Sequence, residues 1–455
     1  MTRVAVVAAV ALSVMAFASA AAQDVPATDQ GRTVSYDEAL ALAVQNSFEL
    51  KLADEDVRDA ERRRSRAKHQ YHPRLKVQGT ALGDLFSVDQ WSSDRNLGAG
   101  LVLDWAPYRN GEDLREMATS RVGMTIAALD RRQAAIDIEH GFRTFYHGLL
   151  ETADDVELKQ RKRDLEEQRL RAVEADFDNG RATKSDVLTQ SGVFFEADAA
   201  WRKSRQTLQV GLIELAERTG LDAVAGVQDI DRTIGPVAEV SVEDCIATAQ
   251  GTRLVLLTSR ERLRLADLGV KYAKLKRLPS VYFFTDSDYA LTQRIGGNEL
   301  ELRMGVTVSY PLYGAGDTAA IIADAKAAAV RARIQDSQTH IKVEREIREA
   351  YWNSVNSVRL LESTREREQI FEDSYTEAKV EHERGAMSDI DFTAAEIRYL
   401  ESRQRVRTME LDAILARATL LKALGVASFA EIMRAPAEGA APRQGPTKPA
   451  KKGAQ

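Results

Sequence analysis

The sequence is poor in cysteine, proline and aromatic residues. Its 455 residues include one cysteine, ten prolines and 6% Phe, Trp and Tyr. A single cysteine allows no disulfide within the chain, and the apolar helical pattern around Cys245 predicts a small buried residue. Few aromatic residues and few prolines argue against one thick globular core and favour long helices.

The sequence also has no excess of positive charge and none of the common catalytic motifs. Lys and Arg number 63 against 69 Asp and Glu, a net charge of −6, so nucleic acid is not an expected partner. It contains no Gly-rich phosphate loop and no nucleophile elbow. The histidine pairs His69/His72 and His140/His147 have no third ligand nearby in sequence, so no metal site is expected. We therefore predict neither an enzyme nor a cofactor-binding protein.

Long apolar runs occur only at the N-terminus. A short basic start precedes the apolar stretch from Val4 to Phe17, and small residues follow it, so residues 1–22 are predicted to be a signal peptide. No later stretch is apolar enough for the about 20 residues of a spanning helix. We expect an exported chain in which any membrane crossing uses strands. Residues 435–455, rich in Pro, Ala, Gly and Lys, are expected to form a disordered tail.

A short turn motif occurs twice and indicates a duplicated architecture. Each copy holds a glycine to close one helix, a hydroxyl residue to cap the next, and an aspartate three residues later, as in a capping box. The two copies are Gly180, Thr183 and Asp186, and Gly385, Ser388 and Asp391.

Around these turns, the hydrophobic periodicity predicts two repeats with the same order of helix, strand, strand, long helix and helix. The first spans residues 33–220, with helices at 36–70, 111–177 and 185–218 and strands at 74–82 and 97–105. The second spans residues 241–425, with helices at 241–277, 316–384 and 390–424 and strands at 280–288 and 300–310. The long helices would each span about 100 Å, and the two shorter helices of a repeat together match that length. We expect them to lie end to end beside it.

The strands alternate between apolar and polar residues. In the fourth strand Glu301, Arg303, Thr307 and Ser309 share the polar face. Four strands are too few to close a barrel, and open sheet edges are costly in lipid, so we expect oligomerisation. Three copies give a twelve-stranded transmembrane barrel, with these four residues lining the pore. Trp105 and Tyr310, at the same end of their strands, fit an interfacial aromatic belt or a packed barrel base.

The chain resembles the TolC family of outer-membrane efflux proteins (outer membrane factors). The resemblance lies in the doubled element order, the two turns, and the entries into the long helices at Tyr108 to Gly111 and Tyr313 to Gly316. It implies a mainly α-helical homotrimer, with a β-barrel in the outer membrane of a Gram-negative bacterium and a helical tunnel in the periplasm. A periplasmic adaptor (membrane fusion) protein and an inner-membrane RND or ABC pump would be its partners, in tripartite efflux or type I secretion. The implied function is a passive conduit, opened by contact at the hairpin end.

In well-known family members, the second turn is followed by two aspartates that ring the closed tunnel mouth. Here the first position is Asp391, but the second is Ala394, while the first repeat has Asp186 and then Thr189. A single ring of three Asp391 side chains is the gate this pattern predicts. The alternative is that Asp391 and Asp186 only favour helix N-termini.

Two further alternatives remain. Basic clusters before Pro73 and Pro279 fit either lipid phosphates of the outer membrane or the C-terminal ends of helices. The chain as a whole also fits a periplasmic coiled-coil scaffold or adaptor without a pore. Such a protein would have to cover the apolar strand faces, and this requirement separates the two hypotheses.

Overall fold

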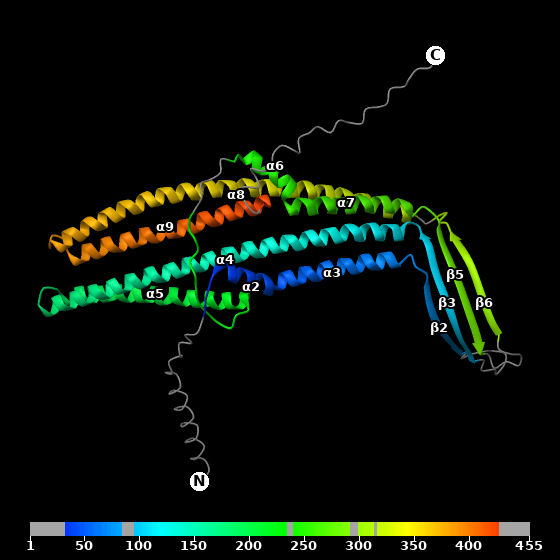
Figure 1. Cartoon of the computed structure of the whole chain (residues 1–455), viewed down its shortest axis with the longest axis horizontal. Helices are drawn as coiled ribbons and strands as arrows, with labels where there is room; N and C mark the ends of the chain where they lie inside the picture. Colours follow the sequence, from blue (N-terminus) through cyan, green and yellow to red (C-terminus); the bar gives the residue numbers. More distant parts are fainter. Residues whose placement is uncertain (1–31, 84–94, 234–239, 292–298, 314–315, 427–455) are drawn as a thin grey trace, which may run out of the picture.

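The computed structural model describes residues 32–83, 95–233, 240–291, 299–313 and 316–426. Long helices run side by side, a sheet lies at one end of them, and the α4–α5 and α8–α9 turns lie at the other (Figure 1). The elements are β1 (Arg32–Val34), α2 (Tyr36–Asn46), α3 (Phe48–His69), β2 (Arg74–Gly83), β3 (Arg95–Arg109), α4 (Glu112–Asp178), α5 (Lys184–Thr219), β4 (Val224–Val227), α6 (Val242–Thr252), α7 (Leu254–Leu275), β5 (Ser280–Leu291), β6 (Glu299–Ser309), α8 (Asp317–Glu383) and α9 (Asp389–Leu424).

The helices of the two halves match in length. α2 and α6 have 11 residues each, α3 and α7 have 22, α4 and α8 have 67, and α5 and α9 have 36. No helix within the described ranges is both long and apolar enough to cross a membrane. α3 and α5 both pack along α4, and α7 and α9 both pack along α8, which confirms the expected end-to-end arrangement of the shorter helices.

The first helix of each half is interrupted, so the prediction of one continuous helix was wrong. In the first half the chain leaves the helix at Ser47, whose hydroxyl accepts a hydrogen bond from the Leu50 amide at 3.3 Å and so caps α3. The Asn46 side chain donates to the carbonyl oxygen of Thr219, the last residue of α5, at 2.5 Å. The C-terminal end of α5 therefore packs at the break between α2 and α3, where Asn46 gives the Thr219 carbonyl the hydrogen-bond partner that the end of a helix lacks.

The second half repeats this arrangement. α6 ends at Thr252, whose hydroxyl donates to the carbonyl oxygen of Leu424, the last residue of α9, at 2.6 Å. Gly425 follows with a φ of 72°, and a Cβ there would lie 3.0 Å from the Thr252 carbonyl oxygen. The left-handed glycine therefore both ends α9 and lets it approach the break closely.

Residues Arg32–Val34 form a strand that the sequence analysis did not predict. β1 pairs in parallel with β4 of the linker between the halves. The hydroxyl of Tyr146, on α4, lies 2.7 Å from the carbonyl oxygen of Gln228 and 3.2 Å from that of Val34. Tyr146 is fully buried, and this burial raises its pKa to about 12. A pairing between segments so far apart in sequence leaves no local signal.

The sheet has the order β2-β3-β5-β6, and every neighbouring pair is antiparallel. All four predicted strands are confirmed. β3 continues to Arg109, with a register shift between Trp105 and Tyr108. The two strand hairpins therefore join at β3 and β5, which makes one sheet from both halves.

α4 is the helix that joins the two halves. It packs against α3 and α5 of its own half and against α7 and α9 of the other. α8 packs along α6, α7 and α9, all from its own half. Buried cores lie around Tyr146 in the first half and around Ile347 and Cys245 in the second, so Cys245 is the small core residue that was predicted.

Candidate functional site

One face of the sheet is apolar and exposed. Cross-strand partners share a face of an antiparallel pair, so the register places Leu75 with Leu103, and Phe283 with Trp105 and Val306. Leu75 and Val77 of β2 are 68% and 81% exposed. On β6 the exposed fractions lie between 61% and 68% for Leu302, Met304, Val306 and Val308. Two edge strands with uncovered apolar rows mark a surface that meets an apolar environment.

The opposite face carries polar and charged groups. Arg303, Thr307 and Ser309 occupy the other alternate positions of β6, and Glu301 belongs to the same series, which agrees with the predicted pattern. On this face the Lys76 ammonium of β2 lies 2.9 Å from the Asp104 carboxylate of β3. Both side chains remain about half exposed. The role of the four β6 residues as a pore lining stays a prediction.

Aromatic residues occur on both faces at the helix-proximal end of the sheet. Trp105 donates its indole N–H to the Tyr71 carbonyl oxygen at 2.9 Å, and its ring meets that of Phe283 edge-on with centroids 6.4 Å apart. Tyr310, just beyond β6, is 57% exposed. Phe283, which the sequence analysis did not include in the aromatic belt, lies on the same face as Trp105. Tyr282 and Phe284 lie on the polar face. The belt itself remains a prediction for Trp105 and Tyr310.

At the far end of the molecule, both helix hairpins close with the same backbone geometry. Gly180 and Gly385 have φ values of 72° and 73°. The amides of Arg181 and Ala386, each following its glycine, donate to the carbonyls of Asp176 and Glu381 at 2.7 and 2.9 Å. This is the Schellman pattern, in which the left-handed glycine lets two amides satisfy the last carbonyls of the helix. The predicted role of both glycines is confirmed.

The residues after each glycine cap the outgoing helix, as predicted. The Asp186 carboxylate accepts hydrogen bonds from the Thr183 amide and hydroxyl, both at 2.8 Å, while the Asp186 amide donates to Thr183 Oγ1 at 3.3 Å. The hydrogen bonds from Thr183 hold the pKa of Asp186 below its ordinary value. In the second hairpin, Ser388 Oγ donates to the Asp391 carboxylate at 2.7 Å and accepts from the Asp391 amide at 3.2 Å. The role of these aspartates as a tunnel gate stays a prediction.

The second hairpin also contains a column of rings that the sequence analysis missed. His382 stacks on Phe392 with centroids 4.5 Å apart, and its Nε2 lies 2.7 Å from the Asp389 carboxylate. Tyr375 stacks between Phe392 and Tyr399, at 5.8 and 5.3 Å. The spacing of these residues along α8 and α9 was the available signal, but only the pairing of the two helices makes them neighbours. The first hairpin has Phe177, 43% exposed, at the position that corresponds to His382.

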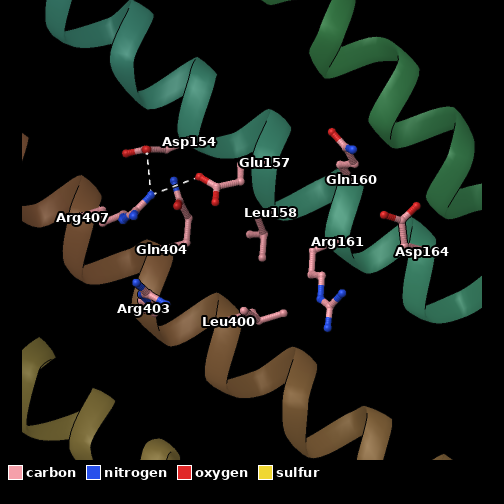
Figure 2. Close-up of a pocket in the computed structure, with 10 residues that line it drawn as sticks. All are labelled: Asp154, Glu157, Leu158, Gln160, Arg161, Asp164, Leu400, Arg403, Gln404 and Arg407. Atoms are coloured by element: carbon pink, nitrogen blue, oxygen red, sulfur yellow. Dashed lines mark hydrogen bonds and ion pairs between the residues drawn. The ribbon is translucent and has the colours of Figure 1, made fainter. Parts of the chain in front are cut away.

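Between the two halves, α4 and α9 are joined by charged side chains that we call the inter-repeat seam. Figure 2 shows its groove, of about 400 Å³, with Arg407 of α9 directed toward Asp154 and Glu157 of α4 at 3.1 and 3.3 Å. Closer to the hairpins, Arg161 pairs with Glu396 at 3.0 Å, and Lys162 pairs with Glu401. Asp154, 9% exposed, also contacts Arg232 of the linker at 2.9 Å. Arg407, Arg161 and Lys162 each pair across the seam with a carboxylate, so the groove suits cohesion of the two halves rather than catalysis.

The histidines of the predicted pairs have different surroundings. His69 and His72 lie with ring centroids 5.7 Å apart at the end of α3. His147 is 4% exposed, and burial lowers its pKa, so it stays neutral at pH 7. Nearby, burial and the Asp412 carboxylate raise the pKa of Glu151. In the part of the chain that the structure describes, no group of three or more His, Cys, Asp or Glu residues is placed to hold a metal ion.

The fold and these surfaces correspond to known proteins. Residues 246–426 match the sequence model of the outer membrane efflux protein family. The CmeC outer membrane channel of Campylobacter jejuni superimposes with a TM-score of 0.71 at 16% identity, covering 86% of this chain and 85% of CmeC. VceC of Vibrio cholerae gives 0.69 at 17% identity, with 86% and 96% covered. MtrE of Neisseria gonorrhoeae gives 0.71 at 13% identity, with 86% and 89% covered. No curated protein matches the chain.

The match in sequence covers less of the chain than the match in fold. The family sequence pattern covers most of the second repeat, and the fold shared with the solved channels extends over both repeats. The sheet has one apolar and one polar face, and two helical hairpins lie at the opposite end of the molecule. The chain therefore resembles the outer membrane efflux proteins in sequence over residues 246–426, and it has the fold of solved outer membrane channels.

Proposed function

We propose that this chain forms the exit duct of a tripartite efflux pump or type I secretion system. The observation that carries the proposal is the sheet, whose uncovered apolar face and charged opposite face continue directly into helices of 67 residues. An apolar band suits lipid, and a polar face suits a water-filled pore. A helix of that length spans about 100 Å, a distance suited to a periplasmic tunnel. The duct is passive, because its surfaces carry no convergent catalytic groups among the described residues.

The edges of the sheet support assembly into a trimer. Among the described strands, β2 and β6 each pair on one side only. Because all neighbours are antiparallel, β6 of one copy placed beside β2 of the next continues the same alternation of direction. Three copies then give twelve strands and no free edge, which satisfies the backbone groups that lipid cannot.

An apolar row on α8 supports the same assembly in the helical part. The row lies at helical spacing, faces away from α7 and α9, and is 53% to 68% exposed: Val330, Ile334, Ile341 and Trp352. α3 on the opposite side of the molecule exposes Phe48 and Leu52. Neighbouring subunits that bring these two sides together bury both surfaces.

We propose that a periplasmic adaptor binds at the hairpin end and links the chain to an inner-membrane RND or ABC pump. Three copies bring three Asp391 side chains to the tunnel mouth. Asp391 uses its carboxylate to accept one hydrogen bond from Ser388, so the other oxygen is available to attract cations. In this proposal, contact at the hairpin end opens the tunnel by breaking the ion pairs that Arg161 and Lys162 make across the inter-repeat seam.

A periplasmic scaffold without a pore is the competing function. It would leave apolar side chains such as Val77, 81% exposed, in water. The exposed row extends over both edge strands, so covering it would require another protein on that whole face. The outer-membrane duct explains the same row by its contact with lipid.

Conductance in a planar bilayer tests the duct. The purified native protein should give small, stable unitary steps, and divalent cations added on the hairpin side should reduce them. Asp391→Ala should remove this block, with Asp389→Ala as the matched control, since Asp389 contacts His382 instead. Sedimentation in detergent should give the mass of three chains. A protein that stays soluble without detergent and gives no steps would refute the duct in favour of the scaffold.

A further inference from the structure

Two exposed aromatic side chains stand on the polar face of the sheet. Tyr282 and Phe284 of β5 are 41% and 40% exposed. The register pairs Tyr282 with Thr307, and Phe284 with both Asp104 and Gly305. Both rings therefore share the face that carries Thr307 and the Lys76–Asp104 ion pair. Exposed rings among charged and hydroxyl groups are not needed for contact with lipid, which lies on the other face.

The position of the Phe284 ring depends on Gly305. A Cβ added to Gly305 would lie 2.9 Å from two carbons of that ring, so the ring occupies the space a side chain would take. Covering a strand glycine with an aromatic ring stabilises a sheet, and this accounts for Phe284 alone. Tyr282, opposite a threonine, has no such reason to be aromatic.

The first repeat provides an internal comparison. There Gln78 lies opposite Gly100, as Phe284 lies opposite Gly305, and Lys76 lies opposite Val102, as Tyr282 lies opposite Thr307. The glycine is present in both repeats, but its partner is an amide in one and a phenyl ring in the other. The aromatic character of this surface is therefore specific to the second repeat, and the fold does not require it.

We propose that Tyr282 and Phe284, which we call the aromatic patch, form a binding surface inside the duct for planar aromatic cations. This inference rests on the proposed function, because the patch faces the lumen only in the closed barrel. Ring faces carry negative charge density and attract cations and flat aromatic molecules. The Asp104 carboxylate, directly across from Phe284, lies 2.9 Å from the Lys76 ammonium and balances that positive charge beside the ring. Three patches in the trimer alternate with the polar strands of the first repeat.

Single-channel block tests the patch. Ethidium, a planar aromatic cation, is added on the sheet side of the bilayer, and tetrapropylammonium serves as a cation without rings. For Phe284→Leu, the ethidium concentration for half block should rise by roughly fivefold, from the loss of cation–π attraction, while that for tetrapropylammonium stays unchanged. Phe284→Trp should restore the native value. The matched control is Phe283→Leu, which removes the same ring from the opposite face and should leave ethidium block unchanged.

The outcomes separate this inference from the proposed function. Absence of unitary steps from the native protein would refute the duct and the patch together. Steps with ethidium block that Phe284→Leu does not weaken, or that Phe283→Leu weakens equally, would overturn the patch and leave the duct intact. An aromatic anion, anilinonaphthalene sulfonate, that blocks as strongly as ethidium would overturn the preference for cations. Unchanged unitary conductance of each variant in the absence of blocker shows that its barrel has formed.

Discussion

The two repeats use helices of the same lengths but differ in what they contact. α4 packs against both halves of the chain, while α8 keeps one side uncovered. In the middle of the first repeat, the β1–β4 pair covers Tyr146 and accepts its hydrogen bonds. The corresponding residue of the second repeat, Tyr351, packs instead against a core formed with α6 and the end of α9. The two repeats therefore share their helix lengths, but the first makes the contacts between the halves and the second leaves an apolar helix surface exposed.

The largest effect should come from the two cores. Phe142 and Ile347 lie at the same position along α4 and α8 and are 2% and 1% exposed. Truncation to alanine should cost about 3–5 kcal/mol for Phe142 and about 2–5 kcal/mol for Ile347, from lost burial and the cavity left behind. Thermal loss of helical circular dichroism in detergent measures both. Lys326→Ala, on the exposed side of α8, is the control and should change little. A tolerated Phe142→Ala would contradict the view that the first repeat holds the molecule together.

A smaller effect should separate the two tyrosines. Tyr146→Phe removes the hydroxyl that donates to the Gln228 carbonyl and leaves this partly buried oxygen without that donor, at a cost of about 1–2 kcal/mol. Tyr351→Phe should be close to neutral, because within the described residues its hydroxyl makes no hydrogen bond. Amide hydrogen exchange at β1 and β4 is the measurement, and exchange should quicken in the first variant alone. Equal protection in both variants would remove this difference between the repeats.

The smallest effect concerns the hairpin caps and their dependence on pH. Thr183→Ala and Ser388→Ala should each cost about 1 kcal/mol through the lost cap. Asp186 has a folded pKa below its unfolded value, so its contribution is complete above about pH 4 and is lost as pH falls through the lowered folded pKa. Proteolysis of the first hairpin should therefore quicken in strong acid, and in Thr183→Ala this acid dependence should shrink. A hairpin that opens equally at pH 3 and pH 7 would argue against the capping box.

The candidate site was predictable where its signal is local. The Gly180 and Gly385 turns follow from residue types that tolerate φ > 0 and cap helices, and the polar row of β6 follows from its period of two. The ring column at His382 was missed because its residues become neighbours only when α8 and α9 pair across the hairpin. The ion pairs of Arg407 were not predictable, because they join helices that are far apart in the chain. Phe284 was missed for the same reason, since its face is defined by its neighbour strands.

The sequence by itself determined the order and length of the elements, the two turns and the alternation of the strands. These properties depend on backbone propensity and on the spacing of apolar residues, which act over a few residues. Tertiary structure alone decided where the first helix of each half breaks, because Asn46 and Thr252 lie where the ends of α5 and α9 need donors for their last carbonyls. It also decided which charges join the halves and which rings meet, since burial and pairing depend on helices and strands brought together from distant segments.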